Sequence, residues 1–482
     1  MARGLLSRES IGLERNGGPS GGLPARARWL LAERISRTLS EAGDTPVITE
    51  RVVRLAVPVG QVAPLRWLRA QSLLPKVYWS GRGGQSARAA VGVADLQEGD
   101  APESAEALRK RLSALLSSGD AEARYYGGLR FDPLREPDAE WTSFGAYRFV
   151  LPRFELHTGD CEAMLVCNLV LPRDTQRHTE ILEEVERLSF SQDASGDTLA
   201  EPVSRTDHPD REGWRLNLER ALAAFSEGRL DKVVLARRTE LVFAEEVDAA
   251  LLAERLEEVT PGCFHFYVEP EAGVAFVGAS PERLFRREGH LIESEAVAGT
   301  RPRGASEADD DELRDDLLRS EKDKVEHDHV RVGIGEALGP LCDELEVEGG
   351  VSEMKTPSRR HLVSRVRGVL REGVTDPEIL RALHPTPAVG GYPVQEALAE
   401  IRAAEPFDRG WYAGPVGWIG ANEAEFAVGI RSGLVRGRSL SLFSGAGIVE
   451  GSVSEAEWAE VEQKIGDFTG IFGFDPARHA AR

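Results

Sequence analysis

The chain has 482 residues, of which 41% are hydrophobic and 29% are charged, a composition typical of a globular protein with a large buried core. Its formal net charge of −21 argues against nucleic acid and anionic membranes as partners, because both are negatively charged themselves. No apolar run approaches the roughly 20 residues needed to cross a bilayer, and residues 1–25 lack the continuous apolar core of a signal peptide. We therefore predict a cytoplasmic protein with a flexible leader at residues 1–25.

Two residue types, lysine and cysteine, are rare in this chain. Basic residues are almost all arginine, and the sequence contains only seven lysines. The four cysteines lie in or beside apolar runs and form no CxxC pair; they are Cys161, Cys167, Cys263 and Cys342. This pattern predicts reduced thiols in a core, without a disulfide framework or a thiolate metal site.

An N-terminal α+β region is predicted at residues 26–190. Amphipathic spacing indicates helices at residues 27–39 and 104–116. Strand patterns follow a different periodicity and occupy residues 52–57, 76–80, 144–151 and 163–171. Residues 191–212 are polar and contain Pro, Gly, Ser and Asp throughout, so we interpret them as a linker.

A second, larger region is predicted at residues 213–474. Helices are expected at residues 214–227, 247–259 and 309–338. Strands are expected at residues 232–243, 264–268, 274–278, 426–434 and 440–444. Strands and helices do not alternate as strict βαβ units, so the pattern favours an α+β fold.

One helix near the C-terminus combines two carboxylates with an amine. It follows the small-residue turn Gly445-Ala446-Gly447, and Ser454 with Glu457 matches a capping box. Glu457, Glu460 and Lys464 form a stripe at the edge of its apolar face. The stripe fits a site for a hard cation and an anionic ligand, but it equally fits a helix cap and an ordinary i,i+4 ion pair.

A second carboxylate pair, Asp323 and Glu326, has i,i+3 spacing on the predicted helix at 309–338. Acidic pairs on helices are commonly solvated faces. Convergence of all four carboxylates would require a divalent cation to offset their repulsion, and oxygen-only ligands favour Mg²⁺. His327 and His329 lack the HExxH or cysteine partners of a zinc site. The glycines at 445–451 break the GxGxxG spacing, so no nucleotide cofactor is predicted.

Two further residues are candidates for acid–base chemistry. Lys232 begins an apolar strand, where a lysine is either a solvated edge residue or, if it points into a closed cleft, a usable general base. Glu282 follows Ser280-Pro281 at a strand end, and glutamates in such turns are usually solvated. Neither residue by itself shows whether the chain carries out acid–base chemistry.

Taken together, these segments resemble the chorismate-utilising enzymes, and within that family the isochorismate synthases. The matching segments are DKVVLAR (231–237), GASPERLF (278–285), AVAGTRPR (296–303), SEKDKVEHD (320–328), LHPTPAVGG (383–391), RGWYAGPVGW (409–418), FAVGIRS (426–432) and GAGIVEGSVSEAEWAE (445–460). Weaker matches extend the resemblance to roughly residues 75–470. The fold implied by the resemblance is a large α+β unit with a β-sheet core and peripheral helices.

The resemblance also implies roles for particular residues. Lys232 would activate water for attack at C2 of chorismate, and Glu282 would protonate the departing C4 hydroxyl. Glu326 and Glu460 would hold Mg²⁺, with Asp323 and Glu457 behind them or bonded through water. The residues that would bind the substrate are Gly299, Thr300, His384, Tyr412, Arg431, Gly447 and Lys464.

Particular residues distinguish this chain from relatives that catalyse other reactions. Aminodeoxychorismate synthases carry a lysine nucleophile where this chain has Ala298. Relatives that use ammonia need no base at position 232, whereas attack by water does. The prediction is therefore a Mg²⁺-dependent isochorismate synthase, with a salicylate synthase or a catalytically silent chorismate-binding regulatory module as alternatives. Its product could serve menaquinone or siderophore biosynthesis, and the N-terminal region resembles the menaquinone type.

Overall fold

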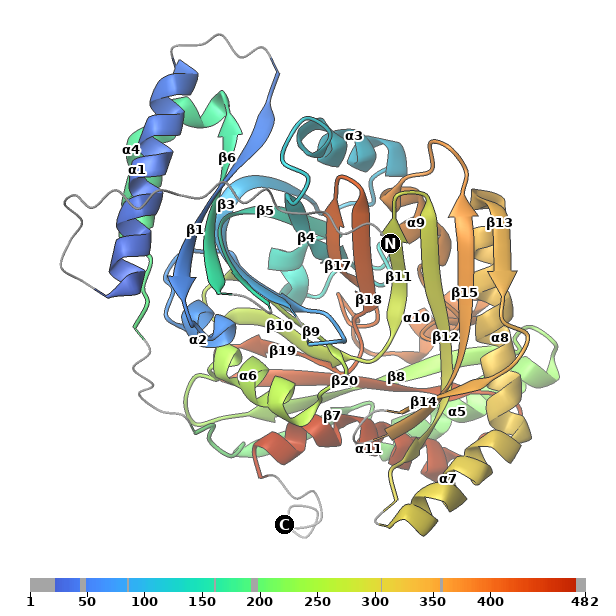
Figure 1. Cartoon of the computed structure of the whole chain (residues 1–482). Helices are drawn as coiled ribbons and strands as arrows, with labels where there is room; N and C mark the ends of the chain where they lie inside the picture. Colours follow the sequence, from blue (N-terminus) through green and yellow to red (C-terminus); the bar gives the residue numbers. More distant parts are fainter. Residues whose placement is uncertain are drawn as a thin grey trace.

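The computed structural model describes residues 22–43, 49–84, 86–159, 162–191, 198–304, 306–355 and 359–473 (Figure 1). The described strands form one connected antiparallel sheet system with helices on its outside, which confirms the predicted α+β class. The helices are α1 (Leu23–Gly43), α2 (Pro64–Arg69), α3 (Ala105–Leu116), α4 (His178–Glu186), α5 (Arg211–Ser226), α6 (Ala249–Val259), α7 (Glu307–Arg319), α8 (Glu321–Leu338), α9 (Asp376–Leu383), α10 (Val394–Ala404) and α11 (Ser454–Ile471).

The strands are β1 (Arg51–Gly60), β2 (Lys76–Ser80), β3 (Ala87–Gly99), β4 (Arg124–Leu129), β5 (Tyr147–Thr158), β6 (Ala163–Leu171), β7 (Ser204–His208), β8 (Lys232–Val242), β9 (Phe264–Glu271), β10 (Val274–Ser280), β11 (Arg283–Glu288), β12 (Leu291–Pro302), β13 (Cys342–Val347), β14 (Ser352–Lys355), β15 (Arg359–Leu370), β16 (Gly391–Tyr392), β17 (Pro415–Gly420), β18 (Glu423–Val428), β19 (Ser432–Arg436) and β20 (Ser439–Ile448). Short 3₁₀ turns are η1 (Ala139–Phe144), η2 (Arg173–Arg177) and η3 (Gly339–Leu341).

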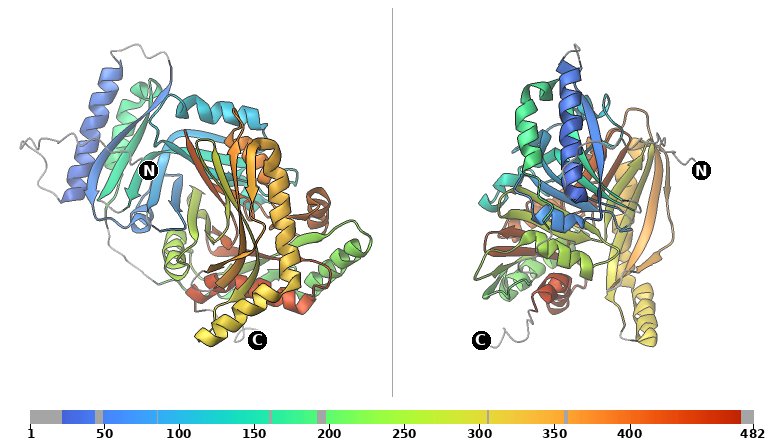
Figure 2. Two further views of the ribbon diagram at one scale, coloured as in Figure 1. Left: turned by 45° about the vertical axis from the view of Figure 1, so that its right-hand side comes forward. Right: turned by 60° about the vertical axis from the view of Figure 1, so that its left-hand side comes forward.

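Helices α1 and α4 cover one face of the N-terminal strands, next to β1 and β6 (Figure 2). In α1 the buried residues are Ala27, Leu31, Ile35 and Leu39, an i,i+4 stripe that explains why this segment packs as a helix. The helix begins at Leu23, inside the range predicted as leader. Along the other half of the molecule, α8 packs against β12 and β15.

The two predicted regions share one sheet. Strand β2 pairs with β9, and β4 pairs with β17, so backbone hydrogen bonds cross from one region to the other. Strand β7 lies within the predicted linker and pairs with β8. Its sequence gave no strand signal because an edge strand with both faces partly exposed needs no apolar alternation.

The main core also draws on both regions. Trp141 and Phe144 contact aromatic rings from the C-terminal half: the ring centroids of Trp141 and Phe276 are 5.5 Å apart, and those of Phe144 and Trp411 are 5.2 Å apart. Aromatic side chains bury more apolar area than most others, so this cluster ties the halves together strongly.

Two predicted elements are each divided in the structure. The helix expected at residues 309–338 is two helices, because Ser320 ends α7 and its hydroxyl caps α8 by accepting a hydrogen bond from the Asp323 N–H. The strand expected at 426–434 is interrupted between β18 and β19, where Arg431 has a positive φ of 47°. Asp323 lies just after the first interruption and Arg431 lies at the second, so both interruptions set the positions of predicted site residues.

The predicted capping box of the last helix does not form. Helix α11 begins at Ser454, with Val453 as its N-cap and no side-chain cap. The Glu457 carboxylate is engaged elsewhere, by Lys322.

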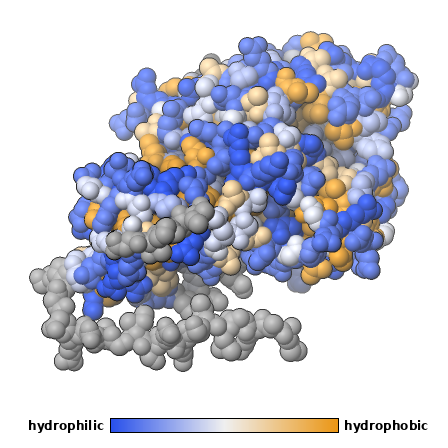
Figure 3. All heavy atoms as spheres, turned by 90° about the horizontal axis from the view of Figure 1, so that it is seen from above, coloured by the Kyte–Doolittle hydropathy of each residue, from blue (hydrophilic) through white to orange (hydrophobic). Residues whose placement is uncertain are grey.

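None of the described helices is long and apolar enough to cross a membrane. Figure 3 shows a face on which hydrophobic residues are interspersed with hydrophilic ones. The described cysteines, Cys167, Cys263 and Cys342, are buried free thiols, as predicted; Cys161 lies outside the described residues.

Candidate active site

A cleft with an empty volume of about 880 Å³, including its open mouth, brings most of the predicted site residues together. Ten of the thirteen line it: Glu282, Gly299, Thr300, Asp323, Glu326, Tyr412, Arg431, Gly447, Glu460 and Lys464. They come from β12, α8, β20, α11 and the turns that precede β11, β17 and β19. Residues that are more than a hundred positions apart in the sequence therefore meet at one surface.

Lys232 lies directly behind the wall of this cleft. Its side chain is fully buried at the start of β8, and its Nζ is 3.1 Å from Glu326 Oε1. Gly447 lines the cleft beside both residues: a Cβ at this position would collide with the Glu326 carboxylate and lie 3.1 Å from Lys232 Cε. The absence of a side chain at Gly447 is therefore what leaves Lys232 and Glu326 close to the cleft.

Glu282 is buried at the end of the turn that leads into β11. Burial raises the pKa of its carboxyl to about 8, and the nearby Glu295 carboxylate acts in the same direction. The positive charges of Lys232, Lys464 and Arg431 oppose the rise. A carboxyl with this pKa is largely protonated at neutral pH and can donate a proton.

The four carboxylates of the two predicted i,i+3 pairs are each held by one cation. Glu326 pairs with Lys232 at 3.1 Å, and Glu460 pairs with Lys464 at 2.8 Å. Glu457 is almost fully buried, outside the cleft lining, where its carboxylate accepts a hydrogen bond from Lys322 Nζ at 2.6 Å. Asp323, at the start of α8, accepts from Arg301 Nη2 at 2.8 Å.

The donor chemistry of this cleft fits magnesium. The described residues contain no group of three or more His, Cys, Asp or Glu side chains placed to hold a metal ion. Magnesium does not need such a cage, because it commonly binds through one or two carboxylates and completes its shell with water and substrate oxygens. Glu326 and Glu460 line the same cleft from different helices and supply ligands of this kind.

The end of the cleft near Arg431 contains a residue that sequence reasoning missed. The buried His361 on β15 contacts Thr300 Oγ1 through Nδ1 at 2.9 Å and Arg431 Nη2 through Nε2 at 3.2 Å. Since a guanidinium only donates, Nε2 accepts and Nδ1 carries the hydrogen. Burial and the charges of Arg431 and Arg359 hold the pKa of His361 well below its usual range, consistent with a neutral ring. No local spacing marks this histidine in the sequence.

His384 lies apart from the cleft, although the resemblance implied that it lines the ring pocket. Its Nε2 donates to the carbonyl oxygen of Phe131 at 2.9 Å, and its ring lies edge-on to the Phe131 ring. Tyr412, by contrast, lines the cleft and stacks on Phe443 with ring centroids 5.4 Å apart. A hydroxyl hydrogen bond to substrate is therefore available from Tyr412, while His384 supports the wall from behind.

Comparison with known proteins gives matches over most of the chain. Residues 38–473 match the family model described as chorismate binding enzyme. The chain is 35% identical to isochorismate synthase 2, chloroplastic, of Arabidopsis thaliana, over 92% of this chain and 84% of the relative. It is 36% identical to isochorismate synthase MenF of Bacillus subtilis, over 70% and 72% of the two chains. The structure of MenF, the menaquinone-specific isochorismate synthase from Escherichia coli, superposes with a TM-score of 0.79 at 28% identity, covering 92% of this chain and 100% of that one.

Proposed function

Because this chain belongs to the family of chorismate-binding enzymes, we propose that it is an isochorismate synthase, an isomerase that converts chorismate to isochorismate. The observation that carries the proposal is that a buried lysine, Lys232, and a buried carboxyl with a raised pKa, Glu282, both lie at one cleft. Exchange of a hydroxyl between two ring carbons needs one group that accepts a proton from water and another that gives one to the leaving hydroxyl.

In this reaction Lys232, once its ammonium has released a proton and become a neutral amine, takes a proton through Nζ from the water molecule that attacks C2. Glu282 gives its proton to the C4 hydroxyl, which leaves as water, and the ring double bonds shift between the two carbons. One water molecule enters and one leaves, so the reaction is a net isomerisation. Lys232 then holds the extra proton and Glu282 is ionised, and return of one proton from the amine side to the acid side resets the enzyme.

The substrate is held by the remaining cleft residues. Arg431 and Lys464 are the cations that face the carboxylates of chorismate, and Tyr412 and Thr300 add hydroxyl donors. Mg²⁺, bound by Glu326 and Glu460 with Asp323 and Glu457 behind them, would supply positive charge for the ring carboxylate. This arrangement fixes the ring between the base and the acid, where correct orientation lowers the barrier.

The cellular context belongs to the same proposal. The protein works in the cytoplasm on a small-molecule substrate, without a nucleotide cofactor or nucleic acid. Its product enters menaquinone biosynthesis: the similarity extends through the N-terminal strands and covers the whole of the menaquinone-specific relative from Escherichia coli.

The test is identification of the product. Purified protein is incubated with chorismate and Mg²⁺, and the mixture is separated by chromatography while pyruvate is measured in parallel. We expect isochorismate without stoichiometric pyruvate. Pyruvate equal to the chorismate consumed would identify a salicylate synthase, and unchanged chorismate would identify a silent binding module. EDTA should stop turnover and added Mg²⁺ should restore it; activity that is indifferent to EDTA would contradict the metal site.

A further inference from the structure

One edge of the strand that carries Lys232 is incomplete. Strand β8 pairs with β20 from Val233 to Val242. On its other edge β16 pairs only with Lys232 and Val233, and β7 pairs only from Arg238 onward. No described strand fills this edge at residues 234–237, and Val234 in this gap lines the cleft.

A buried ion pair fills the gap. Arg409 Nη2 donates to Val234 O at 2.7 Å, and Glu405 Oε1 accepts from the Ala236 N–H at 2.8 Å. The two side chains also bind each other, with Arg409 Nε 2.8 Å from Glu405 Oε2. Both are at most 2% exposed and neither lines the cleft. Together they give β8 the donor and the acceptor that a neighbouring strand would have supplied.

The same guanidinium reaches two other walls of the cleft. Arg409 Nη1 donates to Val389 O at 2.8 Å, in the loop that precedes β16. The Arg409 carbonyl accepts from the N–H of Tyr412, whose ring centroid lies 5.7 Å from the guanidinium carbon. Val234, Val389 and Tyr412 all line the cleft and come from three separate segments.

We propose that Arg409 and Glu405, which we call the clamp, are positioning residues that set the place of Lys232 relative to the Val389 loop and Tyr412. This inference rests on the proposed function, since it assigns a purpose to the geometry around the base. The pair acts through β8, because Lys232 lies two residues before Val234. Its side-chain bonds reinforce the backbone hydrogen bond from the Val234 N–H to Gly390 O, which joins this strand to the loop carrying Val389. The substrate-binding cations Arg431 and Lys464 are outside the clamp, so its loss should disturb the chemical step more than binding.

The chain contains a matched control. Arg153 and Asp174 form another fully buried ion pair. Arg153 Nη1 donates to Asn168 O at 2.7 Å, and Asp174 Oδ2 accepts from the Val170 N–H at 2.7 Å, so this pair completes an edge of β6 in the same way. It lies among the N-terminal strands, outside the residues that line the cleft.

The experiment compares Arg409→Lys with Arg153→Lys. Lysine keeps the charge but cannot reproduce the planar fork that bonds several acceptors at once. We expect Arg409→Lys to lower kcat by about 10²-fold, the effect of a base displaced by roughly 1 Å, with the KM for chorismate within about threefold. Arg153→Lys should lower the melting temperature and leave kcat per folded molecule unchanged. Glu405→Gln, which keeps an oxygen for the Ala236 N–H, should retain most of the activity.

Hydrogen–deuterium exchange separates the outcomes. In Arg409→Lys, amides of residues 232–238 and 384–391 should exchange faster than in the wild type, whereas Arg153→Lys should leave them unchanged. Wild-type kcat in Arg409→Lys, equal kcat losses in both variants, or unchanged exchange at 232–238 would overturn the positioning role. If the wild type does not isomerise chorismate, the proposed function fails by itself, and the exchange data still test whether the clamp holds β8.

Discussion

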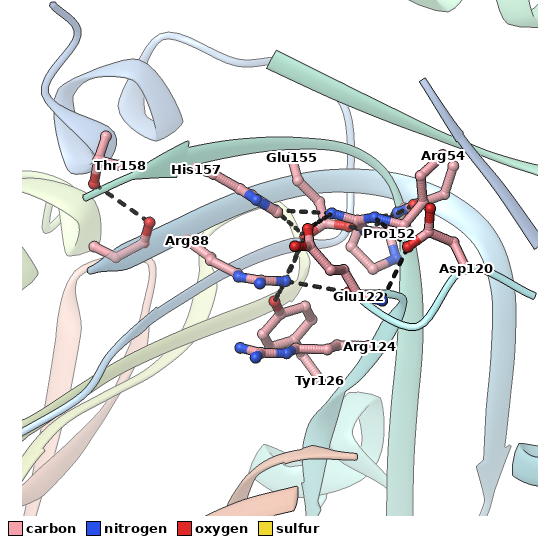
Figure 4. Close-up of polar contacts among 12 residues, drawn as sticks. Arg54, Arg88, Asp120, Glu122, Arg124, Tyr126, Pro152, Glu155, His157 and Thr158 are labelled. Carbon is pink, nitrogen blue, oxygen red and sulfur yellow. Dashed lines mark hydrogen bonds and ion pairs between the residues drawn. The ribbon is translucent and has the colours of Figure 1, made fainter. Parts of the chain in front are cut away.

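Buried carboxylates lie in two contrasting environments in this molecule: a cluster around Glu155 and the cleft. Around Glu155 on β5, which we call the Glu155 cluster, the carboxylate is fully buried and has several partners (Figure 4). Arg54 Nη1 lies 2.8 Å from it, His157 Nε2 2.8 Å and Asn168 Nδ2 2.6 Å, while Arg88 is 3.7 Å away. In the cleft, Glu326, Glu460 and Asp323 each have one cationic partner. Glu282, by contrast, lines the cleft without an ion-pair partner among the described residues.

The difference is visible in the proton affinities. Burial alone would raise the pKa of Glu155, but Arg54, His157 and Arg88 outweigh it and hold the pKa well below its usual range. Glu282 is buried as deeply, and there the cations do not compensate, so its pKa rises to about 8. A buried carboxylate with enough cationic and hydrogen-bonding partners stays ionised and stabilises the fold. One with too few partners keeps a proton that it can donate.

The choice of cation follows the same division. The cluster around Glu155 uses arginine, whereas Lys232, Lys322 and Lys464, three of only seven lysines in the chain, pair with the carboxylates of the active site. Arginine stays charged and forks onto its partner, while lysine is a single point charge that can lose its proton. Asp323 is the exception among the cleft carboxylates, because it pairs with Arg301.

The largest expected effect comes from replacing the proposed acid and the proposed base. Lys232→Ala and Glu282→Gln should each lower kcat by about 10²–10⁴-fold, the usual contribution of general acid–base catalysis. Steady-state kinetics with chorismate, on protein whose circular dichroism matches the wild type, measures the change. Wild-type turnover in either variant would show that the replaced residue is not needed for the reaction. The cleft would then have no functional difference from the Glu155 cluster at that residue.

A smaller effect is expected from pH. Glu282 must be protonated to act, so activity should be lost as the pH rises through its pKa of about 8, falling about tenfold per pH unit above it. A kcat profile between pH 6 and pH 10 measures this limb. The residual activity of Glu282→Gln should lack it, because the amide does not titrate; a limb that persists in the variant belongs to another group.

The smallest effect on turnover is expected in the Glu155 cluster itself. Glu155→Gln leaves Arg54 without its buried counter-charge and should lower the free energy of unfolding by about 3–5 kcal/mol, with kcat per folded molecule unchanged. Because the folded pKa of Glu155 lies below the unfolded value, this stabilisation is present above about pH 5 and is lost as the pH falls through the folded value. Urea unfolding at pH 7 and pH 4 measures both points.

Local patterns in the sequence predicted the elements that carry the site, but not how the elements meet. The i,i+3 pairs Asp323/Glu326 and Glu457/Glu460 lie on helices as expected. The cation that each carboxylate would receive could not be predicted, because Lys322 and Glu457 are 135 positions apart and meet only through the packing of α8 near α11.

Some differences between the predicted and the observed structure could have been predicted from the local sequence, and others could not. Ser320 with Asp323 has the S-x-x-D spacing of a helix start, which signals the break between α7 and α8. His361 gave no such signal: its contact with Arg431 depends on how β15 and the turn before β19 are placed by the sheet. Long-range registration of strands, not local propensity, decides such contacts.

The pairing of β2 with β9 and of β4 with β17 has a consequence for the modularity of the protein. In the described residues, strands from each half form backbone hydrogen bonds with strands from the other half. Aromatic rings from the two halves also pack against each other. Recombination that exchanged one half for that of a distant relative would have to match strand register and ring shape at the same time. The N-terminal strands and the cleft are thus parts of one architecture.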